Sequence, residues 1–82
     1  MIDSTILNKA LLPLADQYEG GHNDRWVSLA VTKAEEFEPF RETMAALRAE
    51  GSVSISSFGT YQMTSSGYAK YSEKIQALRV LS

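Results

Sequence analysis

The sequence predicts a small α+β domain in the order helix, short strand, two helices, β-hairpin and helix. Three observations predict it. Apolar residues recur at three- and four-residue spacing near both ends of the chain, the spacing changes to two between residues 52 and 64, and glycine or proline separates the segments. With 82 residues, 44% of them hydrophobic, the chain is expected to form one domain, 1–82, around one core.

The first helix is predicted over about 4–19. Its apolar positions follow a helical spacing: Ile6, Leu7, Ala10, Leu11, Leu14 and Tyr18. Asp3 or Ser4 can serve as the N-cap. Because Pro13 has no N–H to donate to the carbonyl of residue 9, we expect the helix to kink or to begin afresh near Leu12. The glycine-rich stretch 20–24 reads as a loop.

A short strand is predicted at about 25–27, where Arg-Trp-Val is rich in residues that favour strands. A helix is then expected at about 29–37. Ser28 or Thr32 can cap it, and Thr32 has Glu35 three residues on, which is the spacing of a capping box.

The next helix is predicted at about 39–50. The ring of Pro39 disfavours helix at Glu38 but suits the first turn of a new helix. Gly51, just past the end, supplies the left-handed conformation that often stops a helix. One apolar face of this helix contains Phe40, Met44 and Leu47.

A β-hairpin is predicted at about 53–64. Val53 and Ile55 alternate with serines, and Tyr61 and Met63 alternate with polar residues, around a turn at 57–59. The last helix is predicted at about 65–80, with Thr64 or Ser65 as its cap. Its apolar face contains Tyr68, Tyr71, Ile75 and Leu78.

The composition limits the classes of function that the protein can have. Eight Lys and Arg face ten Asp and Glu, so a net charge of -2 provides no general attraction to nucleic acid or to an anionic membrane. No apolar run approaches the roughly 18 residues that span a bilayer, and the start of the chain lacks the pattern of a signal peptide. We expect a cytoplasmic protein, and the absence of cysteine agrees with a reducing compartment.

The side-chain inventory predicts no enzyme, no cofactor and no metal site. There is no cysteine nucleophile, and the single histidine, His22, lies in a glycine-rich loop. Gly20 and Gly21 lack the residues of a phosphate-binding loop. The carboxylates at 35, 36 and 38 lack the spacing of a calcium loop, and a solvated acidic face is the better interpretation.

Three segments resemble the winged helix-turn-helix superfamily, as found in small bacterial and phage-type domains. They are RWVSLA (25–30), MAALRAEGSVSI (44–55) and YQMTSSGYAKY (61–71). The resemblance covers about 25–82. It implies that the helices at 29–37 and 39–50 form the helix-turn-helix and that the hairpin at 53–64 is the wing. It also implies a small DNA-binding transcriptional regulator, dimeric in many cases, whose third helix enters the major groove.

In this interpretation the candidate DNA contacts are Lys33, Arg41, Arg48, Thr60 and Gln62. A single arginine that reads guanine contributes about 1–3 kcal/mol of discrimination. Two features of the charge distribution count against DNA. Residues 33–50 sum to -2 and the hairpin carries no charge. For Arg41 itself, an ion pair with Glu38 or with the turn of Glu42 on a solvated helix face is the favoured interpretation.

The alternative is a winged helix that binds protein, for example a phage- or mobile-element-type inhibitor or adaptor. Its acidic third helix, with Glu38 and Glu42, would then face a basic partner. Phe58 is an anchor if it is exposed at the hairpin tip, or it folds back over the hairpin or onto Trp26. Val80 and Leu81 add apolar surface that forms a homodimer or closes the monomer's own core. The acidic helix favours protein, whereas the resemblance favours DNA, and a small DNA-binding regulator is the function that we expect first.

Overall fold

A computed structural model describes residues 2–21 and 25–81 and has an α+β architecture of four α-helices and one antiparallel hairpin. The first helix, α1 (Ser4–Glu19), begins as predicted. The Asp3 carboxylate accepts a hydrogen bond from the Ile6 N–H at 3.0 Å. The Asp3 N–H in turn donates to the buried Thr43 hydroxyl at 2.9 Å. The cap therefore also joins the start of the chain to a later helix.

Pro13 lies inside α1, and the helix continues through it. The expected fresh start near Leu12 is therefore wrong. Apolar residues on both sides of the proline are buried in one core: Leu7, Ala10 and Leu11 before it, and Leu14 and Ala15 after it. Their burial offsets the hydrogen bond that Pro13 cannot make.

The helix predicted at 29–37 is not formed. Val27 makes one antiparallel bridge to Tyr61, which is all that remains of the strand expected at 25–27. The chain then runs without helix to Lys33, and only the single turn η1 (Ala34–Glu36) is helical, of 3₁₀ type. Lys33 precedes this turn and offers no side-chain cap, so the capping box with Thr32 is absent.

The reason lies in the pattern of residues 27–32, Val-Ser-Leu-Ala-Val-Thr. Their exposure alternates, with Val27, Leu29 and Val31 half-buried and the residues between them exposed. A period of two is the pattern of an extended chain with one face on the core. Valine and threonine, branched at Cβ, also favour the extended conformation over helix.

The helix α2 (Phe37–Ala49) corresponds to the predicted helix at 39–50 but begins two residues earlier. Pro39 fits in its first turn, where the missing N–H has no intrahelical partner to lose. Met44 and Leu47 are buried, and Phe40 packs against the core. The helix ends before Gly51, whose φ of 83° is the left-handed conformation expected there.

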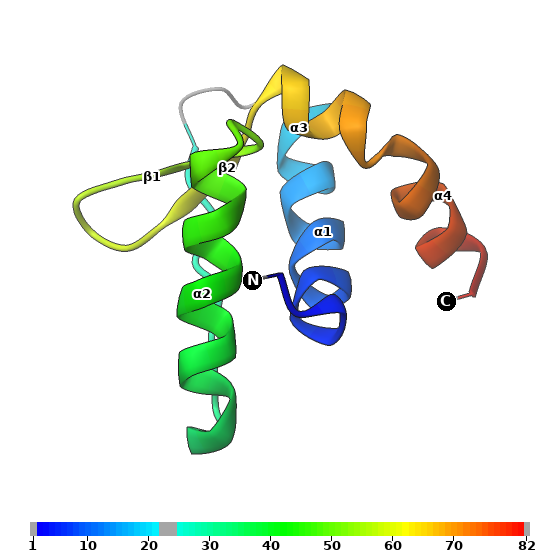
Figure 1. Ribbon diagram of the computed structural model, residues 1–82. Coiled ribbons are helices and arrows are strands. Elements are labelled where there is room, and N and C mark those ends of the chain that lie inside the picture. The colour runs from blue at the N-terminus through cyan, green and yellow to red at the C-terminus, as the bar shows by residue number, and fades with distance from the viewer. Residues whose placement is uncertain (1, 22–24, 82) are drawn as a thin grey trace.

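The hairpin forms as predicted, from β1 (Val53–Ile55) and β2 (Tyr61–Met63). Val53 pairs with Met63 and Ile55 with Tyr61. Val53, Tyr61 and Met63 are buried on one face, as the alternation predicts. The hairpin projects beside the upper part of α2 (Figure 1).

The last predicted helix, at 65–80, divides into α3 (Ser65–Lys70) and α4 (Ser72–Leu81). Thr64 caps α3 as expected, since its hydroxyl accepts from the Gly67 N–H at 3.0 Å. The break falls at Tyr71, whose φ of -104° and ψ of 12° depart from helix. Its hydroxyl donates to Glu50 at 2.5 Å, whereas α4 turns back to contact α1. The hydrogen bond of Tyr71 to Glu50 and the contact of α4 with α1 hold the chain in different directions, so the helix is interrupted at this residue.

The core lies around α1, which stands between α2 on one side and α4 on the other, with α3 across one end (Figure 1). Leu11, Leu14, Met44, Leu47 and Ile75 are its most deeply buried large side chains. None of the helices within 2–21 and 25–81 is both long and apolar enough to cross a membrane.

Candidate binding surface

The exposed face of α2 carries two rows of opposite charge. Helical spacing places Arg41 and Arg48 in one row and Glu38 and Glu42 in another. Ala45 lies between the rows, Ala49 continues the acidic row towards the end of the helix, and all six side chains are exposed. Because Ala45 and Ala49 are short, a second chain can approach this exposed face of the helix closely.

A groove of about 510 Å³ separates the arginine row from the hairpin. It is lined by Arg41, Met44, Ala45, Arg48, Ala49, Ile55 and Tyr61. The lining is apolar except for the two guanidinium groups and the Tyr61 hydroxyl, and no carboxylate belongs to it. Desolvation by burial raises the pKa of the Tyr61 hydroxyl.

The two arginines differ in their partners. Arg41 pairs with Glu38 at 3.2 Å, with both side chains about three-quarters exposed. Such a pair contributes only tenths of a kcal/mol, so Arg41 can exchange Glu38 for another carboxylate at little cost. Arg48 forms no ion pair with another residue in 2–21 or 25–81. Both cations are therefore available to a ligand.

Phe58 is at the hairpin tip and 93% exposed. Of the two alternatives left by the sequence, the structure has the exposed ring rather than one folded onto the hairpin or onto Trp26. The turn is held beneath it, since the Phe58 N–H donates to the Ser56 hydroxyl at 3.1 Å. Trp26 is itself 43% exposed.

The side chains of Thr60 and Gln62 both form hydrogen bonds within the chain. The Thr60 hydroxyl lies 2.6 Å from that of Ser56. The Gln62 amide donates to the Arg25 carbonyl at 2.6 Å, next to the bridge at Val27. Neither residue lines the groove beside α2.

The remaining predicted residues lie apart from this groove. Lys33 is exposed immediately before η1. Val80 and Leu81 are 82% and 84% exposed at the end of α4, so they do not close the core of the single chain.

Two of the three cations near the C-terminus, Lys70 and Arg79, form ion pairs within the molecule. Lys70 pairs with Glu50 at 2.8 Å. Arg79 pairs with Asp16 at 2.9 Å and with Glu19 at 2.7 Å. Hydrogen bonds from Arg79, and secondly from the Tyr68 hydroxyl, lower the pKa of Glu19 to about 2. These contacts hold α3 and α4 against α1 and the end of α2.

The carboxylate of Glu50, like that of Glu19, joins parts of the chain that are far apart in the sequence. Burial opposes its ionisation, but hydrogen bonds from Lys70, Tyr71 and Ser52 outweigh burial and lower its pKa. Burial, together with the bond to Glu50, raises the pKa of Tyr71 to about 12. Neither the contacts of Glu50 nor those of Glu19 could be predicted from the spacing of residues in the sequence, because the partners lie about 20 and 60 residues apart.

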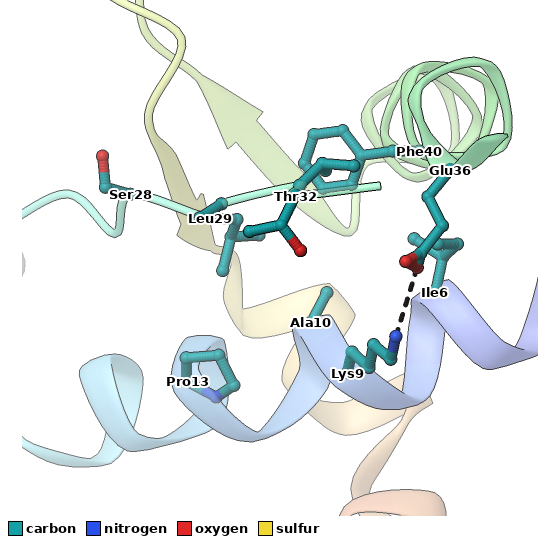
Figure 2. Close-up of a pocket in the computed structure, with 11 residues that line it drawn as sticks. Ile6, Lys9, Ala10, Pro13, Ser28, Leu29, Thr32, Glu36 and Phe40 are labelled. Atoms are coloured by element: carbon teal, nitrogen blue, oxygen red, sulfur yellow. Dashed lines mark hydrogen bonds and ion pairs between the residues drawn. The ribbon is translucent and has the colours of Figure 1, made fainter. Parts of the chain in front are cut away.

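A second groove, of about 300 Å³, separates α1 from the extended segment 28–32. Figure 2 shows Ala10 and Pro13 of α1 facing Leu29 across it, with the ion pair between Lys9 and Glu36 at one end. That pair spans 3.1 Å. The groove was not expected, since it requires the segment to be extended rather than helical.

Within the part of the chain that the structure describes, no group of three or more His, Cys, Asp or Glu side chains could hold a metal ion. Comparison with known proteins found no match to a family model, to a curated protein or to a solved structure.

Proposed function

We propose that this chain is a non-enzymatic protein-interaction module, a variant of the winged helix in which η1 stands in place of the first helix of the helix-turn-helix. The order α1, Val27 bridge, α2, hairpin and C-terminal helices supports this reading of the fold. Its ligand is an amphipathic helix of a partner protein, bound across the exposed face of α2 and the groove beside the hairpin.

The observation that carries this function is the pair of oppositely charged rows on α2. Arg41 and Arg48 are two helical turns apart, about 10.5 Å along the axis. A partner helix with acidic residues at the same spacing would pair with both arginines and set small apolar residues against Ala45 and Ala49. A basic residue on its other flank would face Glu42. Such complementary charge selects the partner and its orientation.

A phosphate backbone is a poorer ligand for the same face. Phosphates drawn to the arginine row would also approach Glu38 and Glu42, and the uncharged hairpin adds no cation. The exposed ring of Phe58 suits a protein surface, where aromatic residues are enriched among the strongest contacts.

The test is selection from a display library of helical peptides against the purified protein. We expect enrichment of peptides with two acidic residues seven positions apart. Arg48→Glu should weaken their binding by about tenfold or more. Lys33→Glu makes the same charge change outside the groove and should leave binding unchanged. Replacing the peptide's matching acidic residue by lysine should restore binding to Arg48→Glu.

Selection of peptides without acidic residues, or equal loss of binding in Arg48→Glu and Lys33→Glu, would contradict the proposed site. Failure to enrich any peptide would contradict the proposed class of ligand.

A second candidate function is DNA binding, favoured by one specific observation: Arg41 and Arg48 lie on the same exposed helix face. It predicts steeply salt-dependent binding to random duplex at low salt, weakened by Arg41→Ala and Arg48→Ala. Fluorescence anisotropy measures it, and absence of binding at low salt would exclude it.

A further inference from the structure

We propose that two copies of this chain associate by antiparallel pairing of their extended segments, residues 28–32, into a continuous two-chain β-ribbon. The surface is separate from the α2 groove, so this inference does not depend on the proposed function.

The segment has a free hydrogen-bonding edge. Val27 uses both its N–H and its C=O towards Tyr61, at 2.7 and 2.9 Å. In an extended chain the backbone groups of successive residues point to opposite edges. Those of Ser28, Ala30 and Thr32 therefore point away from the hairpin, and residues 28–32 form no backbone–backbone hydrogen bond with any described residue.

Nothing in the composition of this edge discourages pairing. Proteins commonly protect exposed edges with lysine, proline or a bulge. Residues 26–32 contain no charged residue and no proline. Ser28, Ala30 and Thr32 are exposed and small, so their own side chains do not obstruct a neighbouring strand.

The second copy is favoured as occupant because the edge complements itself. With the two-fold axis at Ala30, Ala30 faces Ala30 and Ser28 faces Thr32 of the second copy. Both backbone groups of each outward residue are then paired, and the serine and threonine hydroxyls lie within the cross-strand distance at which they interact.

Charge at the ends of the segment agrees with this register. Antiparallel pairing about Ala30 brings Arg25 of one copy towards Glu35 of the other. Both side chains are exposed, and neither forms an ion pair within the described parts of its own chain. Opposite charges therefore meet at both ends of the ribbon, as two-fold symmetry requires.

The experiment compares oligomeric state by light scattering and analytical ultracentrifugation from micromolar to millimolar protein. We expect the wild-type chain to form a dimer. Ala30→Glu should weaken dimerisation by about tenfold or more, because like charges directly opposite each other destabilise paired strands. High salt should partly restore this variant through screening. Ala30→Ser keeps the size small and should dimerise as the wild type does.

Ala30→Pro removes the outward N–H at the two-fold axis and should also be monomeric. Circular dichroism of each variant checks that the monomer is folded, and Ala30→Glu carries the test if the proline variant is not. Leu81→Lys examines the exposed end of α4 and should leave the dimer intact.

A wild-type chain that is monomeric at millimolar concentration would overturn the proposal. A dimer that survives Ala30→Glu and is lost in Leu81→Lys would overturn it too, in favour of an interface at α4.

Discussion

At Gly67 the backbone of α3 passes directly over Ser52. A Cβ at this position would lie 2.2 Å from the Ser52 carbonyl oxygen and 2.7 Å from its Cα. These are backbone atoms of a buried residue, so they cannot move aside as the end of a flexible side chain would. The hydroxyl of Thr64 also donates to the Ser52 carbonyl, at 3.1 Å. A residue without a side chain is required where α3 crosses the end of the α2–β1 connection.

Gly67→Ala is expected to destabilise the fold by about 1–3 kcal/mol or more, because the added methyl group forces two backbones apart. Ser66→Ala, at an exposed position of the same helix, serves as the control and should change stability by less than about 0.5 kcal/mol. Urea denaturation followed by circular dichroism measures both. Equal stability of the two variants would mean that α3 does not cross Ser52 this closely.

Single residues were predictable where their role is local. The cap at Asp3, the left-handed Gly51 and the cap at Thr64 follow from residues no more than a few positions away. Thr43 was not predictable, because its buried hydroxyl is satisfied by the Asp3 N–H from forty positions away. The exposure of Phe58 likewise depends on what the fold places near it.

At the scale of elements, α1, α2 and the hairpin were predictable because each has a long or unmixed apolar period. The segment 28–32 differs from the predicted helix because its alternating apolar pattern outweighs its cap residues where one face of the segment meets the core. The break at Tyr71 leaves no mark in the apolar spacing. The break coincides with the hydrogen bond from the Tyr71 hydroxyl to Glu50, which lies in another part of the chain.

The candidate surface was predictable in part. Arg41, Arg48, Glu38 and Glu42 were identified because α2 was predicted in the correct helical phase. Their separation into two rows follows from that phase. The groove beside them forms only because the hairpin packs against α2, and this packing cannot be predicted from a local sequence pattern.

Ion pairs also join the elements, and they make the stability of the fold depend on pH. Glu19 of α1 accepts hydrogen bonds from Arg79 of α4 and from Tyr68 of α3. Its pKa is lowered on folding from 4.5 to about 2. A carboxyl with a lowered pKa stabilises the native state above its unfolded value, and that stabilisation is lost as pH falls through the folded value.

We therefore expect the urea concentration at the unfolding midpoint to decrease as the pH is lowered from about 4.5 to about 2. Glu19→Gln should show a smaller fall over this range, because an amide does not titrate. Glu73→Gln, at an exposed carboxyl in α4 that forms no ion pair within 2–21 and 25–81, provides the matched control and should keep the wild-type profile. Identical profiles for wild type and Glu19→Gln would contradict the role of this contact.

For the molecule as a whole, α1 is the common support. It contacts α2, β2 and α4, and its inward residues form the centre of the core. The segment 28–32 is the opposite extreme, since it packs half-buried side chains on the core without backbone hydrogen bonds to the described chain. Local stability should differ sharply between the two.

Hydrogen exchange measures this difference. In the Ala30→Glu variant, which keeps the segment monomeric, the amides of Ser28 and Thr32 should exchange at nearly unprotected rates. Those of Leu11, Leu14 and Leu47 should exchange only through global unfolding. Protection of Ser28 equal to that of Leu14 in this variant would contradict an extended, unpaired segment.

Trp26 gives this region an optical signal of its own. It is the single tryptophan of the chain, and its ring is 43% exposed. In an extended chain it lies on the same face as Ser28 and Ala30. Indole emission moves to shorter wavelength as the ring leaves water. The tryptophan fluorescence of the unlabelled protein therefore comes from a single ring, and it reports on the surroundings of this face.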